Sequence, residues 1–313
     1  MIRLGTRGSA LALAQARWVA ERLPGEVELV PIKTSGDESP RLKASDPLSA
    51  ADSRGLTPFG DKSRFVKEIE EALLAGEVDL AVHSAKDVPS ELPDGLAIAG
   101  VPPRADARDA LCGAGALDAL PDGAVVGTSS LRRRAALLAL RPDLDIRELR
   151  GNVDTRLRRL AGGDFDAIVL AQAGLDRLAR GGDGSPLAPA TFVPAPGQGC
   201  LVLETRTDDA TSFDAVRPLT DVDALACLAA ERAVVHSLEA TCRTPIGVHC
   251  VTTGDRLRLS AFVGLPDGSH SIKDELEADA ADPSAVGAAV GERMRAAGAA
   301  ELLAEAERAP AAG

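Results

Sequence analysis

The side chains best suited to acid–base chemistry follow a buried apolar run near residue 85. There the segment Leu80–Pro89 runs from a predicted strand into a loop and places Lys86 beside Asp87. A partly desolvated carboxylate at a strand end can act as an acid, a base or a stabiliser of positive charge. An aspartate that only caps the following turn is the alternative, and His83 is explained equally well as a strand-end histidine without a catalytic role.

Arginine side chains suited to binding an anion gather in one part of an otherwise acidic chain. The sequence has 29 arginines against 6 lysines, and nine of the arginines lie between Arg132 and Arg159. A planar guanidinium matches a carboxylate or a phosphate with two parallel hydrogen bonds. A solvated helix surface with no specific partner is the alternative.

Two predicted strand-to-helix turns carry most of these arginines. In the first turn, Gly127–Arg134, hydroxyl and backbone N–H groups should point toward an anion above the helix N-terminus, and those residues are Thr128, Ser129 and Ser130. The next positions, Arg132 and Arg133, lie in the first helical turn, where the helix dipole disfavours cations. The second turn, Arg150–Arg156, repeats the pattern. Because turns after adjacent parallel strands converge, both turns are expected to line one crevice.

A loop cysteine is the candidate nucleophile. Cys242 follows a helical stretch and lies beside Arg243, and a thiol near a cation can have a lowered pKa. The other four cysteines are expected to be inert packing residues, namely Cys112, Cys200, Cys227 and Cys250. There is no Cys-x-x-Cys pair, and the spacing of His249 and Cys242 matches no common metal site. Neither a disulfide framework nor a bound metal is therefore expected.

The elements that must position these residues alternate short apolar strands with helices, which is typical of an α/β protein with mainly parallel sheets. The predicted strands are 2–4, 27–32, 80–83, 96–101, 124–127, 146–149 and 167–171, followed by 248–252 and 257–263. Ser9 can cap one helix, Val66–Leu73 forms another that ends at Gly76, and a long Ala-rich helix follows the last strands. Breaks at Pro102 and over 181–199 predict crossings between domains, and a smaller α/β domain follows residue 221.

The polar segment Thr34–Ser63 separates the first predicted elements from the rest. Loops longer than about 12 to 15 residues are usually lids or unstructured segments. A mobile flap is therefore predicted, with an ordered surface excursion as the alternative.

Length and composition narrow the class of protein. The 313 residues allow two or three domains. A formal charge of −12 and 2% aromatic residues disfavour nucleic acid and anionic membranes as partners. No apolar run approaches the roughly 20 residues of a membrane span, and no secretory signal is recognisable, so a cytoplasmic location is expected. The absence of Walker A, Gly-x-Gly-x-x-Gly, His-Glu-x-x-His and Gly-x-Ser-x-Gly motifs removes the usual nucleotide-binding, zinc-protease and α/β-hydrolase classes.

Taken in order, the motifs closely resemble those of the porphobilinogen deaminase (hydroxymethylbilane synthase) family over nearly the whole chain. The matching segments are Thr6–Gln15, Phe65–Glu68, His83–Pro89, Gly127–Arg133, Arg150–Leu157, Pro194–Gly199 and Cys242–Gly247. The resemblance implies an α/β fold of three domains, the first two like type II periplasmic binding proteins with a cleft between them. Domain 1 would span 1–102 plus 198–218, domain 2 would span 103–197, and a small α/β domain 3 would span 219–313.

The same resemblance implies a transferase that condenses four molecules of porphobilinogen head to tail, releases ammonia and yields hydroxymethylbilane for tetrapyrrole (haem) biosynthesis. The growing chain would be built on a covalently bound dipyrromethane attached to Cys242, and Asp87 would be the catalytic residue. A cytoplasmic monomer is implied, with no nucleic acid, membrane or metal as a partner.

Binding residues follow from the resemblance position by position. The carboxylates of cofactor and substrate would be bound by Arg7, Arg132, Arg133, Arg150, Arg156 and Arg177. Hydrogen bonds would come from Ser9, Ser84, Lys86, Thr128, Ser129 and Ser130, and the predicted binding residues also include Lys62, Phe65, Asn152 and Gln198. This chain departs from the usual family pattern at Pro58, at Asp61–Arg64, at Ala105 and at the pair Ala240 and Thr241 before the cysteine.

Two other classes of function remain as alternatives. A non-enzymatic binder could clamp a polycarboxylate between two domains, but it would not need a third domain with Cys242. A thiol-dependent hydrolase would need a histidine partner for that cysteine, and no sequence pattern pairs one with it.

Overall fold

A computed structural model describes residues 1–34, 66–241 and 244–308, and these ranges build three separate sheets. The first sheet has the strand order β2-β1-β3-β10-β4. Its strands are β1 (Ile2–Arg7), β2 (Val27–Ile32), β3 (Leu80–Ser84), β4 (Leu96–Gly100) and β10 (Leu201–Arg206). Strands β1, β2 and β3 are parallel, whereas β10 runs antiparallel to both β3 and β4. The helices of this part are α1 (Ala10–Ala20), α2 (Lys67–Leu74) and α6 (Ala210–Val216).

The second sheet has the order β7-β6-β8-β5-β9. Its strands are β5 (Asp109–Cys112), β6 (Val125–Gly127), β7 (Asp145–Arg147), β8 (Ala167–Ala171) and β9 (Ser185–Pro186). Strand β6 is parallel to β7 and β8, and β5 is antiparallel to β8 and β9. The helices are α3 (Leu131–Leu140), α4 (Val153–Ala161) and α5 (Gln172–Arg177).

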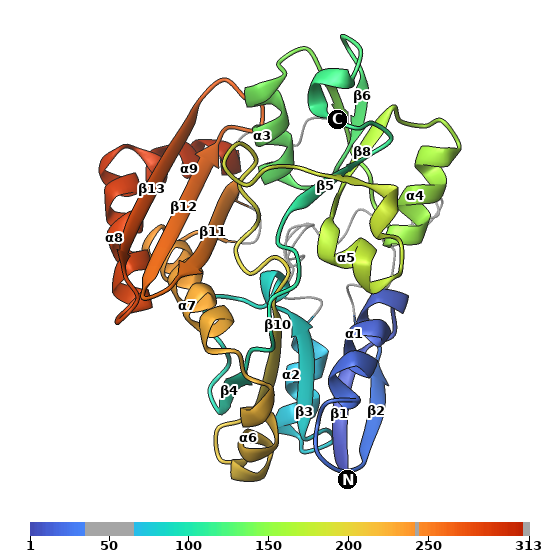
Figure 1. Cartoon of the computed structure of the whole chain (residues 1–313), viewed down its shortest axis with the longest axis vertical. Coiled ribbons are helices and arrows are strands. Elements are labelled where there is room, and N and C mark those ends of the chain that lie inside the picture. Colours follow the sequence, from blue (N-terminus) through green and yellow to red (C-terminus); the bar gives the residue numbers. More distant parts are fainter. Residues whose placement is uncertain (35–65, 242–243, 309–313) are drawn as a thin grey trace, which may run out of the picture.

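The chain crosses twice between these two sheets. It leaves β4 of the first sheet for β5 of the second, and it returns from β9 to β10. Each sheet therefore contains one antiparallel strand that enters from the other side, and Figure 1 shows the two sheets one above the other, joined by these crossings. This exchange of strands is the topology of type II periplasmic binding proteins, so the predicted fold class is confirmed.

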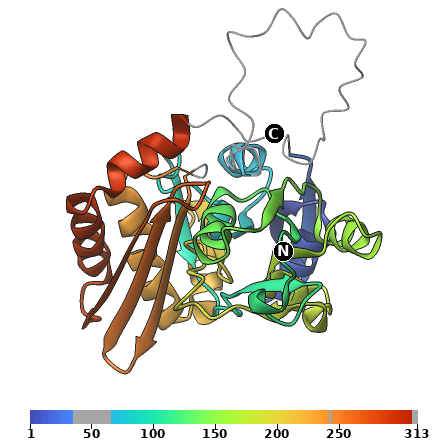
Figure 2. The ribbon, with the colours of Figure 1, turned by 90° about the horizontal axis from the view of Figure 1, so that it is seen from above.

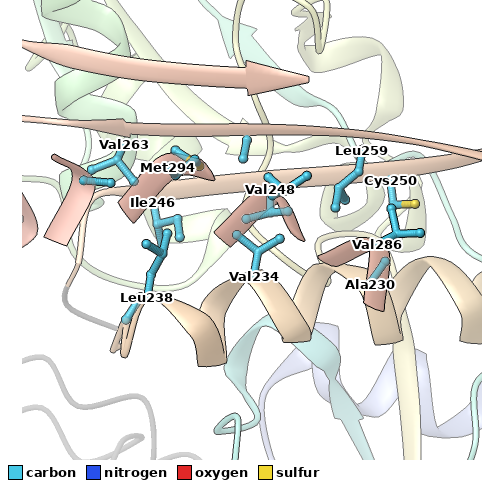
Figure 3. Packing of buried hydrophobic residues seen from close by; sticks show 14 of the residues in the cluster. Ala230, Val234, Leu238, Ile246, Val248, Cys250, Leu259, Val263, Val286 and Met294 are labelled. Carbon is cyan, nitrogen blue, oxygen red and sulfur yellow. The ribbon is translucent and has the colours of Figure 1, made fainter. Parts of the chain in front are cut away.

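A third sheet, β11-β12-β13, stands beside the other two (Figure 1). Its strands are β11 (Ile246–Thr253), β12 (Arg256–Gly264) and β13 (Ser271–Asp279), all antiparallel. The helices α7 (Val222–Ser237), α8 (Pro283–Ala296) and α9 (Ala299–Arg308) contribute side chains to the same core. Figure 3 shows Val234 of α7 and Leu238, directly after that helix, facing Ile246 and Val248 of β11 in that core. Figure 2 shows this sheet and its helices at one side of the molecule.

The single long Ala-rich helix predicted after the last strands is wrong. The segment forms two helices, α8 and α9, that break at Ala297 and Gly298. Gly298 has a φ of 93°, a left-handed conformation that glycine adopts at little cost and that ends a helix.

Polar side chains begin most of the longer helices where the sequence places them. Ser9, Ser130 and Asn152 each accept a hydrogen bond from a backbone N–H three residues on, at the starts of α1, α3 and α4. Asp221 does the same for α7. Such caps satisfy N–H groups that have no partner inside the helix. They therefore fix the turns that carry the candidate site.

Within the described ranges no helix is both long and apolar enough to cross a membrane.

Candidate active site

The candidate catalytic carboxylate lies in a single helical turn at the end of a central strand. Strand β3 ends at Ser84, and the 3₁₀ turn Ala85–Asp87 follows it directly. The neighbouring strand β1 is parallel to β3, so Arg7, at its end, lies at the same edge of the sheet as Ser84. Ser9 follows as the cap of α1, where its Oγ lies 3.3 Å from the N of Ala12.

A glycine lets the second crossing pack directly on this turn. Gly197 has a φ of 71°, and a Cβ there would lie 2.9 Å from the Cβ of Ala85 and 3.0 Å from the N of Lys86. Any larger residue would push the crossing away from the turn. The position of Asp87 is therefore linked to the segment that connects the two sheets.

Gln198 joins the turn to the second sheet. Its Oε1 accepts a hydrogen bond from Lys86 Nζ at 3.5 Å, and its Nε2 donates to Asp109 Oδ1 at 3.1 Å and to the carbonyl oxygen of Ala107 at 2.8 Å. Gln198 is 1% exposed, so these bonds are shielded from water. The predicted binding residues Lys86 and Gln198 are thus brought together, and the link continues to Asp109.

Asp109 pairs with the two arginines at the start of α3. Arg132 Nη1 lies 2.8 Å from its Oδ2, and Arg133 Nη2 lies 2.7 Å from its Oδ1. Burial would raise the pKa of Asp109, but the two guanidinium groups outweigh it and hold that pKa well below its ordinary value. Arg132 also donates to the carbonyl oxygen of Val193 at 2.8 Å, and Arg133 to that of Val169 at 2.7 Å.

Asp109 offsets the repulsion between these two arginines. Both are buried, and the carboxylate of Asp109 compensates their charge and the unfavourable end of the helix dipole. The sequence reasoning missed Asp109. The available signal was an acidic residue directly before the apolar Ala110–Cys112, since a charge that opens a buried strand needs a partner.

The two strand-to-helix turns of the second sheet do lie side by side, as predicted. They follow β6 and β7, which are adjacent and parallel. Ser129, in the first turn, donates from its Oγ to the carbonyl oxygen of Leu149 at 2.5 Å, close to the second turn. Thr128 is buried and its Oγ1 accepts from the N of Ser130 at 3.2 Å.

The residues of the second turn differ in their surroundings. Asn152 caps α4 and accepts from the N of Thr155 at 2.9 Å. Arg150 is exposed and its Nη2 pairs with Glu148 at 2.6 Å. Arg156 instead donates from Nε to the carbonyl oxygen of Gly151 at 2.7 Å.

Two arginines of the predicted binding set are half-buried and form no ion pair with a carboxylate of the described residues. Within the described ranges, neither Arg156 nor Arg177 forms an ion pair, and Arg177 Nη2 donates to the carbonyl oxygen of Gly199 at 2.8 Å. Burial, together with the positive charge of Arg133, lowers the pKa of Arg156 to about 10. Burial also lowers the pKa of Arg177. Such cations are suited to a negatively charged ligand, which would restore their usual pKa values.

A buried ion pair ties both crossings to the third sheet. Arg104 Nη1 lies 2.6 Å from Glu231 Oε1, and Arg104 Nε donates to the carbonyl oxygen of Gln198 at 2.9 Å. Glu231, on α7, also accepts from the N of Gly197 at 2.6 Å and from the N of Cys250 at 2.8 Å. Burial opposes the charge of Arg104, yet Glu231 raises its pKa above the ordinary value. Sequence reasoning did not find this junction, because its members are far apart in the chain.

Several predicted features lie outside the described residues: the cofactor cysteine Cys242, the binding residues Lys62 and Phe65, and the flap 34–63 except for Thr34. The described residue Thr244, close to Cys242, donates from its Oγ1 to the carbonyl oxygen of Thr241 at 2.6 Å.

The remaining four cysteines are all buried free thiols, as predicted for packing residues. Burial raises the pKa of Cys112 to about 11 and that of Cys200 to about 12. These two thiols are therefore protonated and unreactive at neutral pH.

The fold and this site define an α/β protein that exchanges strands between two sheets, carries cationic turns at their junction and has a third domain tied to that junction. A family model described as "Porphobilinogen deaminase, dipyromethane cofactor binding domain" matches residues 2–214, and one described as "Porphobilinogen deaminase, C-terminal domain" matches residues 225–296. The chain therefore belongs to the porphobilinogen deaminase family.

Relatives with that name match over nearly their whole length. The porphobilinogen deaminase of Brevibacillus brevis is 43% identical over 312 residues, covering 97% of this chain and 96% of that protein. The one of Syntrophotalea carbinolica is 45% identical, covering 97% of this chain and 95% of that protein. Among solved structures, a periplasmic substrate-binding protein of a Coxiella burnetii ABC transporter has a TM-score of 0.40 at 17% identity, covering 72% of this chain and 94% of that one.

Proposed function

We propose that this chain joins four molecules of porphobilinogen head to tail on a covalently bound dipyrromethane, releasing ammonia and yielding hydroxymethylbilane for tetrapyrrole (haem) biosynthesis. The observation that carries the proposal is the match of both family models along the chain, the first of them named for the dipyrromethane cofactor. The reaction makes the chain a transferase.

The residues present suit such a cofactor, because its acetate and propionate groups are anions. Arg156 and Arg177 are half-buried cations whose hydrogen bonds go to neutral carbonyl oxygens of the chain. Carboxylates of the ligand would supply the negative charge that these guanidinium groups lack among the described residues. We propose that they bind the cofactor and substrate together with Arg7, Arg150, Ser129 and Asn152.

We assign the remaining binding residues by their place in the same network. Arg132 and Arg133 hold the start of α3 through Asp109 and support the anion site formed by the turn. That turn contributes Thr128 and Ser130. On the side of Asp87, the proposed binding residues are Ser9, Ser84, Lys86 and Gln198, and the set is completed by Lys62 and Phe65.

The dipyrromethane, when bound through Cys242, supplies the pyrrole carbon to which the substrate is joined. Asp87 is the carboxylate proposed to stabilise the positive charge that develops on the substrate pyrrole as ammonia leaves. Lys86, held by Gln198, lies next to it in sequence and provides a cation for a substrate carboxylate. The arginines orient the substrate through its acidic side chains, which leaves the ring free to react.

The test uses the purified full chain. Incubation with porphobilinogen should release ammonia and form hydroxymethylbilane, and the intact mass should exceed that of the sequence by two pyrrole units. Cys242→Ser should lose both the added mass and the activity while keeping the circular dichroism spectrum, because a hydroxyl is a far weaker nucleophile than a thiol.

Matched controls are Cys112→Ser and Cys200→Ser, which replace buried thiols and should keep the adduct. Binding of porphobilinogen without ammonia release would favour the non-enzymatic binder. An adduct that persists in Cys242→Ser would refute the assignment of the cysteine.

We also propose a monomer in the cytoplasm, with domain 1 at 1–102 plus 198–218, domain 2 at 103–197 and domain 3 at 219–313. The position of β10 between β3 and β4 supports the return of the chain to domain 1. The large apolar side chains exposed within the described ranges are scattered over several elements, which suits a monomer, and they are Met1, Leu74, Leu131, Leu140, Val222 and Leu225. The cytoplasmic location rests on the sequence argument above.

A further inference from the structure

Three titratable side chains interact near strand β3, which leads into the turn with Asp87. Glu70 comes from α2, His83 from β3 and Glu204 from β10. In the register of the sheet, Val202 is opposite His83 and Glu204 is opposite Ala81, so Glu204 and His83 lie diagonally on one face. Helix α2 packs against both strands. His83 Nε2 lies 3.1 Å from Glu204 Oε2.

The three groups are buried and incompletely satisfied. Glu204 is 0% exposed, His83 5% and Glu70 8%. Within the described part of the chain, His83 Nε2, both carboxylate oxygens of Glu204 and Oε1 of Glu70 have no hydrogen bond of good geometry. The contact between His83 and Glu204 is therefore short enough for an ion pair but poorly aligned. Natural proteins leave few such groups buried, and each of them calls for a physical explanation.

Among the described residues, the neighbouring cations bond elsewhere and leave an excess of acid in this cluster. On α2, Glu68 lies nearby in sequence, and the exposed Glu71 pairs with Lys67 at 3.8 Å. On β10, Arg206 donates to the carbonyl oxygens of Leu73 and Val78 and pairs with Asp209. On α7, Arg232 donates to the carbonyl oxygen of Ser90 at 2.7 Å, and burial lowers its pKa despite the attraction of Glu204.

We propose that Glu70, His83 and Glu204 form a buried proton-uptake site that positions the Ala85–Asp87 turn, with Glu70 and Glu204 acting through His83 and not by touching the substrate. His83 is followed in the chain by Ser84 and then by the turn, so a shift of its ring moves the strand end that carries Asp87. The inference rests on the proposed function only in taking Asp87 as the catalytic residue.

The two states of the site differ by one proton from solvent. When Glu70 is ionised, its carboxylate and that of Glu204 can both accept a hydrogen bond from the His83 ring, and the ring is held firmly. When Glu70 is protonated, only Glu204 attracts the ring, and the strand end is held less firmly. Burial, together with the negative charge of Glu204, raises the pKa of Glu70 to about 7, so the two states exchange near neutral pH.

The test follows His83 in the full-length protein. The chain has four histidines, so ¹⁵N-histidine labelling gives few ring signals, and His83→Gln identifies the signal of residue 83. In the wild type this signal and the backbone amide signals of Ser84 and Asp87 should shift together with a midpoint near pH 7. Glu70→Gln should abolish that midpoint, whereas Glu71→Gln, an exposed neighbour on the same helix, should keep it.

The second readout is the pH dependence of turnover with porphobilinogen. In the wild type kcat should rise through pH 7, and in Glu70→Gln it should stay at its low-pH level and vary by less than about twofold between roughly pH 6 and 8, with KM unchanged. Glu204→Gln should also remove the midpoint near pH 7, and it is the alternative variant if Glu70→Gln does not fold.

A His83 signal without a midpoint near pH 7 would overturn the proton site. A midpoint without response of the Asp87 amide, or an unaltered kcat profile in Glu70→Gln, would overturn the positioning role. Because the ring and amide signals need no substrate, failure of the proposed function would show separately, as absence of ammonia release in the wild type.

Discussion

Removal of Arg132 tests how the start of α3 is held. Its side chain is 4% exposed and faces Asp109, which is fully buried, at 2.8 Å. In Arg132→Leu, Asp109 keeps Arg133 and Gln198 but loses one of its two cations, and the carbonyl oxygen of Val193 loses a charged donor. Breaking a buried pair by removing one partner costs about 3 to 5 kcal/mol. Because Arg133 remains, we expect a loss near 3 kcal/mol in the free energy of unfolding.

The measurement is urea denaturation of the full chain followed by circular dichroism. Arg147→Leu is the matched control, since Arg147 pairs with Asp145 at 2.6 Å in the same domain but with side chains 58% and 46% exposed. An exposed pair contributes about 0 to 1 kcal/mol. Adding Asp109→Asn to Arg132→Leu should recover part of the loss, because the buried charge then disappears.

The pH dependence gives an independent check of this network. The pKa of Asp109 is lowered in the folded state, so its ion pairs stabilise the fold above the unfolded value of about 3.9 and are lost as pH falls below it. Arg132→Leu should therefore narrow the difference in stability between neutral and acidic pH. The reasoning is refuted if Arg132→Leu lowers the free energy of unfolding by no more than Arg147→Leu does, or if Arg132→Leu raises Tm.

Two further predictions concern the first sheet. Asp87→Asn should keep porphobilinogen affinity but lose most turnover, because the amide cannot offset positive charge as ammonia leaves. Mass analysis of covalent intermediates after one turnover should find few added pyrroles. If all the intermediates form as in the wild type, Asp87 is not catalytic and only caps the turn. The pKa of Glu70 is raised from 4.5 to about 7 in the folded state, so its contribution to stability is fully present below pH 4.5. About 3 kcal/mol of the free energy of unfolding is then lost as the pH rises from 4.5 through 7. Urea denaturation at several pH values should show this decline in the wild type but not in Glu70→Gln.

Elements with a simple pattern of apolar residues could be predicted from the sequence. The predicted strands 27–32 and 167–171 agree with β2 and β8 residue for residue. The helix capped by Ser9 and the helix ending near Gly76 are also present. These elements are bounded by glycine, proline or a polar cap, so local chemistry is enough to define them.

Three of the strands that escaped prediction, β5, β10 and β13, carry charged residues. Strand β13 alternates exposed acidic residues with half-buried Ile272 and Leu276, and its high charge masks the strand pattern. Strand β10 has only three apolar residues before Glu204. A glutamate at that point predicts an exposed position, but Glu204 is fully buried. Charged residues are rarely buried without a partner. In both β5 and β10 the partner comes from a distant element, so the local sequence could not reveal the strand.

The same reasoning explains which parts of the candidate site were found. An arginine at a helix start can be proposed as a binding residue from its own neighbours in the sequence, as with Arg156. Asp109 and Glu204 are different. Each is the only acidic residue in its strand, and its role depends on side chains that the fold brings next to it. Asp109 receives two arginines from α3 and becomes a fixed charge, whereas Glu204 receives His83 and a second acid, Glu70. Buried acids with full compensation stabilise the site, and a buried acid with an excess of like charge binds a proton instead. The first network should therefore be insensitive to pH near neutrality, and the second should respond to it.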